Sequence, residues 1–85
     1  MWYVYLLQNT ETKRIYIGMT EDIKRRLKEH NQRKTRSTRS KKGKWILVYL
    51  ELYRNKKDAI VRETRLKNHG RAKQELLKRI RNSLL

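Results

Sequence analysis

The sequence predicts an α/β fold of the α+β type, in which a small three-stranded antiparallel sheet is flanked by helices in the order ββαβαα. Two short segments rich in Tyr, Val, Ile and Leu stand close together near the N-terminus. A third such segment spans residues 45–53, and amphipathic segments follow the second and the third. A sheet this small needs helices to cover it, and 85 residues without an internal repeat predict one domain over residues 1–85.

The first two strands are expected to form a hairpin. Residues 2–7 and 14–18 have the composition of strands, and the residues between them are mainly polar, as in a hairpin connection. The turn is expected to centre between Thr10 and Glu11.

This turn predicts where the tyrosines lie. It would set Tyr5 opposite Tyr16 and Tyr3 opposite Gly18. Because side chains alternate across a strand, Tyr3, Tyr5 and Tyr16 would share one face of the sheet, beside the glycine. The other face would be apolar, with Val4, Leu6, Ile15 and Ile17.

The first helix is expected to begin after the hairpin and to run to about Asn31. Thr20 or Asp22 can cap its first turn, and Ile23 and Leu27 repeat at the spacing of a buried stripe.

Residues 45–53 give the clearest strand pattern in the chain. Apolar groups stand on both sides of the alternation, which predicts a central strand covered on both faces. One set is Ile46, Val48, Leu50 and Leu52, and the other is Trp45, Leu47, Tyr49, Glu51 and Tyr53.

Two further helices are expected after this strand. Asn55 can cap a helix over residues 56–68, Gly70 stands near the end of that helix, and a third helix is predicted from about Arg71. The side chains expected to face the core are Ala59, Ile60 and Leu66, with Val61 as a further candidate, and then Ala72, Leu76, Leu77 and Ile80.

The formal net charge is +16, from 24 Lys and Arg against 8 Asp and Glu, which indicates a polyanionic partner. Nucleic acid is expected, because the basic residues are spread along the chain instead of lining one amphipathic helix for a membrane surface. There is no cysteine for a disulfide or a thiolate zinc site, and the longest uncharged stretch, residues 45–50, cannot span a bilayer. We therefore expect a cytoplasmic protein, monomeric or weakly dimeric.

Contacts to nucleic acid are expected from a loop over residues 31–44, which carry seven Lys or Arg and no acid, and from the later helices. Such side chains suit contacts to phosphates more than to base edges, so sequence specificity should be low. The alternative is a solvated loop that aids solubility. The expected contacts are Arg33, Lys34, Arg36, Arg39, Lys41, Lys42, Lys44, Lys67, Arg71 and Lys73.

An ordered set of residues gives the chain a family resemblance. The set is Tyr3-Val4-Tyr5, ten further residues, Tyr16-Ile17-Gly18, then Arg26 and His30, and finally Glu63. It resembles the GIY-YIG nuclease superfamily, in particular its small stand-alone bacterial members, with Tyr3 in place of the first glycine of the family name. The resemblance implies metal-assisted hydrolysis of phosphodiester bonds by an endonuclease, in DNA more than in RNA.

The resemblance assigns the general base to a hairpin tyrosine, Tyr5 or Tyr16, which would take a proton from water. A free phenol has a pKa near ~10, so work at neutral pH requires a pKa about 3 lower, with help from nearby cations. The two tyrosines also fit an aromatic cross-strand pair.

Arg26 and His30 share a helix face at i, i+4. Arg26 can hold a non-bridging phosphate oxygen, and the family spacing favours it over Arg25. His30 can donate to phosphate, or it can orient the water and the tyrosine. The alternative is a solvated basic face, with His30 as a helix cap.

Glu63 is expected at the edge of the buried stripe of its helix. The resemblance makes it the ligand of one Mg²⁺ or Mn²⁺ ion that keeps several waters. The alternative is an ion pair with Lys67 or another neighbouring cation. The family commonly adds an asparagine further along the chain, and neither Asn68 nor Asn82 lies at that spacing.

Two other functions fit the same sequence. One is a module that binds nucleic acid without cleaving it. The other is a subunit that depends on a protein partner for its target, because 85 residues leave no separate targeting domain.

Overall fold

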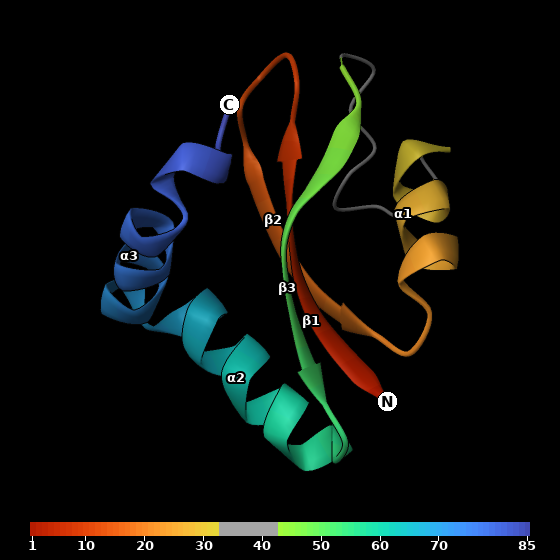
Figure 1. Ribbon diagram of the computed structural model, residues 1–85, viewed down its shortest axis with the longest axis vertical. Helices are drawn as coiled ribbons and strands as arrows, with labels where there is room; N and C mark the ends of the chain where they lie inside the picture. The colour runs from red at the N-terminus through yellow and green to blue at the C-terminus, as the bar shows by residue number, and fades with distance from the viewer. Residues whose placement is uncertain (33–42) are drawn as a thin grey trace.

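The computed structural model describes residues 1–32 and 43–85. A three-stranded antiparallel sheet lies between helix α1 on one face and helices α2 and α3 on the other (Figure 1). The α+β class and the ββαβαα order are therefore confirmed. The elements are β1 (Trp2–Asn9), β2 (Ile15–Thr20), α1 (Ile23–Asn31), β3 (Trp45–Tyr53), α2 (Lys56–Asn68), α3 (Gly70–Arg79) and a 3-10 turn, η2 (Arg81–Ser83).

The β1–β2 hairpin keeps the predicted faces at a different register. Tyr5 pairs with Gly18, and Tyr16 pairs with Leu7, so the predicted pairing was wrong by two residues. Because a side chain returns to the same face every second residue, a shift of two leaves every side chain on its predicted face.

The hairpin turn explains the shift. Asn9 is fully buried, and its Oδ1 accepts hydrogen bonds from the backbone N–H groups of Glu11 and Thr12 at 2.9 and 3.0 Å. Lys13 then takes a positive φ of 64°. The asparagine side chain thus organises a turn centred later in the chain than expected.

Strand β1 is the central strand, in the order β2-β1-β3, and β3 lies at the edge. The prediction of a central β3 was therefore wrong. Its register against β1 shifts at one point, since Leu6 pairs with Tyr49 but Leu7 pairs with Leu47. This irregularity puts Leu47 on the same face as Leu50. Both are more than a third exposed, so the apolar residues on both sides of the sequence alternation do not make β3 a fully covered strand.

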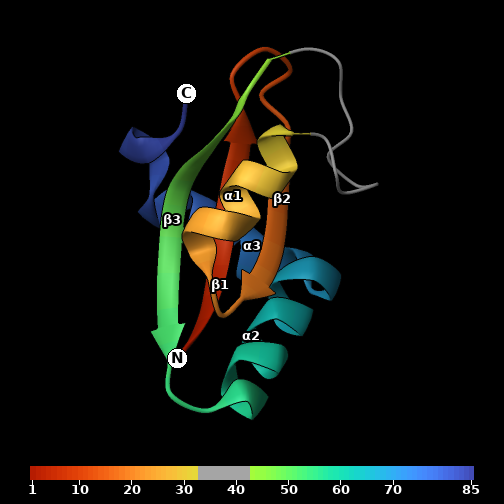
Figure 2. The ribbon, with the colours of Figure 1, turned by 90° about the vertical axis from the view of Figure 1, so that its right-hand side faces the viewer.

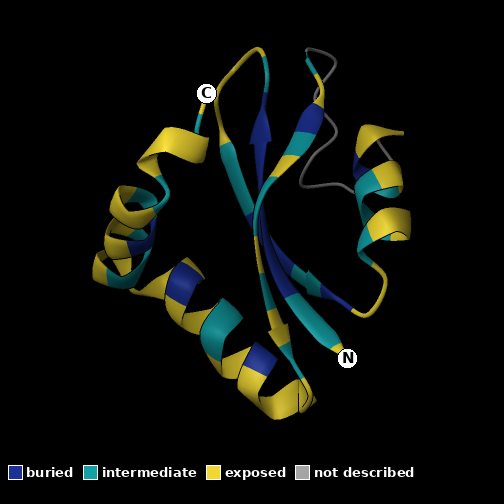
Figure 3. Ribbon diagram, in the orientation of Figure 1, coloured by how far each residue is buried: buried dark blue, intermediate teal, exposed yellow. Residues whose placement is uncertain are grey.

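Each face of the sheet has its own core, and burial concentrates along β1 (Figure 3). Against α2 and α3, the buried residues are Val4, Leu6, Ile17, Ala59, Leu66 and Leu76. Against α1, they are Tyr5, Leu7 and Trp45, packed on Tyr16, Ile23 and Leu27. Figure 2 shows α1 lying across that second face, so the tyrosine face is covered and not open.

Polar side chains cap α1 and α2 as predicted. Asp22 Oδ1 accepts the backbone N–H of Arg25 at 3.0 Å, and Asn55 Oδ1 accepts that of Lys57 at 2.8 Å. Both bonds satisfy donors that the first helical turn cannot use internally. None of the helices in residues 1–32 and 43–85 is long and apolar enough to cross a bilayer.

The core-facing residues of α2 were predicted only in part. Ala59 and Leu66 are buried, whereas Ile60 and Val61 are 43% and 51% exposed. The inward stripe passes from residue 59 to residue 66, two turns on, and the neighbours of residue 59 along the chain fall on the outer side. In α3, Leu76 is buried and the other predicted residues pack partly against the same core.

Asn31, the last residue of α1, fixes the start of β3. Its Oδ1 accepts the Trp45 backbone N–H at 2.7 Å, and its Nδ2 donates to the Trp45 carbonyl at 2.9 Å. Next to it, the Thr10 backbone N–H donates to the Lys44 carbonyl at 2.9 Å, and the Lys44 N–H donates to Thr10 Oγ1 at 3.0 Å. The two ends of the segment between α1 and β3 are therefore held to the sheet.

A half-buried carboxylate joins β3 to α2. Glu51 accepts hydrogen bonds from the Tyr49 and Tyr53 hydroxyls and from Arg62 Nε, which lies 3.0 and 3.1 Å from its two oxygens. Burial favours the protonated carboxyl, but these donors outweigh it and hold the pKa of Glu51 below its usual value.

Replacing Glu51 by Gln should therefore cost about 1–3 kcal/mol in the free energy of unfolding at pH 7. A lowered folded pKa gives stability that is present above the unfolded carboxyl pKa and lost as pH falls through the folded value. Urea denaturation should thus show the difference between wild type and Glu51→Gln shrinking below about pH 4. Glu75→Gln, which breaks an exposed ion pair with Arg71, is the matched control and should cost at most about 0.5 kcal/mol. Equal losses in the two variants would contradict a stabilising role of this network.

Candidate active site

The phenol of Tyr5 lies over the backbone of Gly18. A Cβ added at Gly18 would stand 2.4 Å from the Tyr5 hydroxyl oxygen and 3.1 Å from Tyr16 Cε1. The first distance is far shorter than an ordinary van der Waals contact, and the second is slightly shorter. The glycine is thus required by close approach, and it makes room for two aromatic rings on the face that α1 covers.

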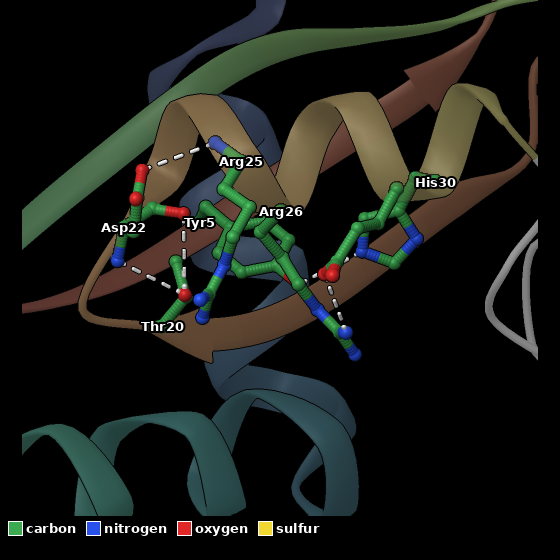
Figure 4. Close-up of polar contacts among 7 residues, drawn as sticks. Tyr5, Thr20, Asp22, Arg25, Arg26 and His30 are labelled. Atoms are coloured by element: carbon green, nitrogen blue, oxygen red, sulfur yellow. Dashed lines mark hydrogen bonds and ion pairs between the residues drawn. The ribbon is translucent and has the colours of Figure 1, made fainter.

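His30, from the last turn of α1, reaches the Tyr5 phenol. It is fully buried, and its Nε2 lies 2.9 Å from the Tyr5 hydroxyl oxygen (Figure 4). Burial, with the nearby Arg26 charge, lowers the pKa of His30 to about 4, so the imidazole is neutral at neutral pH. A buried neutral ring is poorly placed to meet phosphate, so of its two predicted roles the structure favours orientation of the tyrosine.

Tyr16 completes an aromatic cluster. Its ring centroid lies 4.7 Å from that of His30, 6.3 Å from that of Tyr5 and 6.4 Å from that of Trp45. Unlike Tyr5, Tyr16 is only half-buried. The two tyrosines are therefore neighbours on one face, as predicted, but they differ in their access to solvent.

The pKa of the Tyr5 phenol is not lowered. Burial raises it to about 12, hydrogen bonding to Arg26 opposes the rise, and the nearby Tyr16 and Glu63 add to it. The expected lowering of a tyrosine pKa was therefore wrong for Tyr5. At neutral pH its hydroxyl is a protonated hydrogen-bonding group.

Arg26 extends from α1 beside the phenols. Its hydrogen bond to Tyr5 raises its own pKa, so the guanidinium stays charged. Its Nη1 also lies 3.2 Å from Glu29 Oε1. Glu29 was not assigned from the sequence, although its i, i+3 spacing from Arg26 is a signal for such a pair. About a third of the Arg26 side chain is exposed, which leaves it open to a ligand.

Helix α2 brings Glu63 to the site from beside β2. Its charge acts on Tyr5, and its Oε2 lies 3.3 Å from Lys67 Nζ. The ammonium of Lys67 in turn lies 5.9 Å from the centroid of Tyr16. The alternative predicted for Glu63, an ion pair with Lys67, is thus present, and it lies against the tyrosines.

A divalent ion would depend mainly on Glu63. Among the described residues, no group of three or more His, Cys, Asp or Glu side chains lies close enough to hold a metal. One carboxylate with retained waters fits the weak, oxygen-rich coordination of Mg²⁺, whereas a structural zinc site would need more protein ligands.

The basic residues predicted to grip nucleic acid fall in different places. Lys67 stands beside Tyr16, and Lys44 is exposed just before β3. Arg71 and Lys73 lie on α3, across the sheet from α1 (Figure 1), and Arg71 pairs with Glu75. Outside the described residues lie Arg33, Lys34, Arg36, Arg39, Lys41 and Lys42.

Fold and site together define a small α+β domain of the nuclease type, with tyrosines, an arginine and a buried histidine gathered over a strand glycine. The chain belongs to the GIY-YIG family, since the model of the GIY-YIG catalytic domain matches residues 1–77.

Relatives of similar size share the domain. The chain is 36% identical over 78 residues to a UPF0213 protein of Syntrophus aciditrophicus, covering 89% of this chain and 88% of that protein. It is 34% identical over 76 residues to one of Pectobacterium carotovorum, covering 89% and 76%. The solution NMR structure of a UPF0213 protein of Bacillus halodurans is similar with a TM-score of 0.57 and 31% identity, covering 94% of this chain and 85% of that one. These names state no activity.

Replacing Gly18 by Ala should displace the Tyr5 phenol, because the new methyl group would overlap it. We expect a loss of about 1–3 kcal/mol in the free energy of unfolding, measured by urea denaturation, with shifted Tyr5 and His30 ring signals in NMR spectra. Gly70→Ala is the matched control, since its Cβ would meet nothing within 4 Å. It should be neutral or stabilising by up to about 1 kcal/mol. Similar effects of the two substitutions would argue against the proposed seat for Tyr5.

The buried His30 should make stability depend on pH. Its folded pKa lies below the unfolded value, so stability is full above about pH 6.5 and falls as pH drops toward 4. The slope should reach at most about 1.4 kcal/mol per pH unit in wild type, and His30→Gln should lack this component. His69→Gln, at an exposed position, should keep the wild-type slope. If His30→Gln does not fold, NMR titration of the His30 ring in the wild-type protein provides the same test. A measured pKa near 6.5 would show that burial does not lower the pKa of His30.

Proposed function

We propose that the chain is a metal-dependent endonuclease that hydrolyses phosphodiester bonds in DNA or structured nucleic acid with low sequence specificity. The observation that carries the proposal is the convergence of the predicted groups. Tyr5, Tyr16, His30 and Arg26 meet over Gly18, and the carboxylate of Glu63 is near enough to act on Tyr5.

Tyr16 is the general base of this proposal. A base must reach the attacking water, and Tyr16 is half-buried whereas Tyr5 is covered and already bonded to His30. Within residues 1–32 and 43–85, no hydrogen bond occupies the Tyr16 hydroxyl. The Lys67 ammonium lies 5.9 Å from the centroid of its ring.

Tyr5 and His30 act together as positioning residues. Their hydrogen bond at 2.9 Å fixes the phenol against Gly18, and the phenol in turn holds Arg26. Arg26 binds a non-bridging oxygen of the scissile phosphate and stabilises the charge that grows there in the transition state.

Glu63 is the proposed ligand of one Mg²⁺ or Mn²⁺ ion. When bound, such an ion offsets negative charge on the phosphate and on the leaving oxygen. Lys67 now neutralises this carboxylate, but the lysine is 45% exposed, and pairs of this kind contribute only about 0.2–1 kcal/mol. When the ion binds to Glu63, the Lys67 ammonium can therefore leave the carboxylate and interact with a phosphate or with Tyr16 instead.

A second function deserves a test, because the Glu63–Lys67 ion pair also suits a domain that needs no metal. This is a module that binds nucleic acid without cleaving it. It would show salt-sensitive binding that EDTA does not change.

The activity is tested with branched, nicked and single-stranded DNA in Mg²⁺ or Mn²⁺, with EDTA as a blank. Wild type should cleave, and Tyr16→Phe and Glu63→Gln should each lower the rate about 10²–10⁴-fold, as expected for loss of a base or a metal ligand. Glu75→Gln is the matched control for Glu63→Gln, since it also removes the acid of an i, i+4 ion pair, at a distant position on α3. Wild-type cleavage no greater than that of Glu63→Gln would remove the enzymatic function and leave the binding module.

A further inference from the structure

A hollow of about 280 Å³ opens beside Arg26, and the proposed reaction does not use it. Its walls combine two apolar side chains and two cations with two carboxylates and a hydroxyl: Trp2, Met19, Arg25, Arg26, Glu21, Glu29 and Thr20. Arg26 lines the hollow and also interacts with Tyr5, so the hollow adjoins the candidate active site. It can therefore hold the part of a ligand that lies next to the reacting phosphate.

The cationic wall suits successive phosphates. Neighbouring residues on a helix normally point about 100° apart. Figure 4 nevertheless shows the side chains of Arg25 and Arg26 turned to the same side of α1. Arg26 is shared with Tyr5 and Glu29, whereas no carboxylate in the described part of the chain forms an ion pair with Arg25. Arg25 is thus an exposed cation in the wall of the hollow, close to Glu21 in sequence but not in an ion pair with it.

The apolar wall suits a flat ring. Trp2 is half-buried at the start of β1, and one face of its indole carries Lys56 Nζ, 4.8 Å from the ring centroid. Lys56, from α2, can reach that face of the indole only if no other part of the protein covers it. Lys56 is exposed and is not part of the lining of the hollow, whereas Trp2 is, so a base in the hollow can contact the indole and compete with the ammonium for it.

We propose that this hollow is a subsite for the unpaired nucleotide next to the scissile phosphate, with the base stacked on Trp2 and its phosphate bound by Arg25. The inference rests on the proposed function and deepens it by naming the substrate class. A base within a duplex is stacked on its neighbours and cannot offer its face to Trp2. Strands with an unpaired nucleotide are therefore preferred over continuous duplex.

Binding in EDTA tests the subsite without cleavage. The probes are a fluorescein-labelled 12-nucleotide oligothymidylate and a duplex of the same length, followed by anisotropy. Trp2→Leu should weaken binding of the single strand about 5- to 100-fold and that of the duplex less than about twofold. Trp2→Phe keeps an aromatic face and should retain most of the affinity. Circular dichroism verifies that each variant is folded.

The arginine has its own test. Arg25→Gln should lower the salt dependence of single-strand binding by about one phosphate contact. Lys24→Gln removes the same charge from the adjacent position, outside the hollow, and should lower it less. A parallel oligouridylate series shows which sugar the subsite accepts, and a Trp2 effect on either strand supports it.

The subsite is overturned if Trp2→Leu weakens single strand and duplex equally, if it weakens neither, or if wild type binds no probe. These outcomes are separate from the fate of the proposed function. A Trp2 effect in EDTA without any cleavage in Mg²⁺ leaves the subsite and removes the enzyme. Cleavage in Mg²⁺ without a Trp2 effect on binding supports the enzyme and removes the subsite.

Discussion

The site depends on one close approach, the phenol of Tyr5 lying against the backbone of Gly18. The contact requires a residue without a side chain at position 18, on the face of β2 that α1 covers. Once the phenol is seated there, His30 can reach its hydroxyl from α1, and Arg26 can meet it from one turn earlier. Packing of α1 on the sheet and assembly of the polar groups are thus the same event, and a change that lifts the helix also disperses the site.

Local signals were sufficient for much of the fold. Asp22 and Asn55 cap helices where the sequence predicts them, because a cap depends on one side chain and the next turn of backbone. Strand pairing was less predictable, since it depends on contacts distant along the chain. The hairpin register follows from how the buried Asn9 organises the turn, and the edge position of β3 was hidden by the register shift beside Leu6.

At the candidate site, the sequence predicted which side chains lie close together better than it predicted their burial and protonation. The resemblance named Tyr5, His30 and Glu63, and the structure brings them together. It could not indicate that His30 would be fully buried or that burial would raise the pKa of Tyr5, because both follow from the cover that α1 provides. Trp2 could not be assigned from its position at the start of a strand, since the hollow that it lines is formed only when β1, β2 and α1 pack together.

The hydrogen bonds between Asn31 and Trp45 have a consequence for how the edge strand and the site are held. The amide of one side chain takes the place of a neighbouring strand for Trp45, and it does so one residue after His30. The junction between helix and strand is therefore closed by Asn31 and Trp45, the last residue of α1 and the first of β3. The same two side-chain bonds tie the start of β3 to the helical turn that carries His30, so the edge strand and the buried histidine are held in place together.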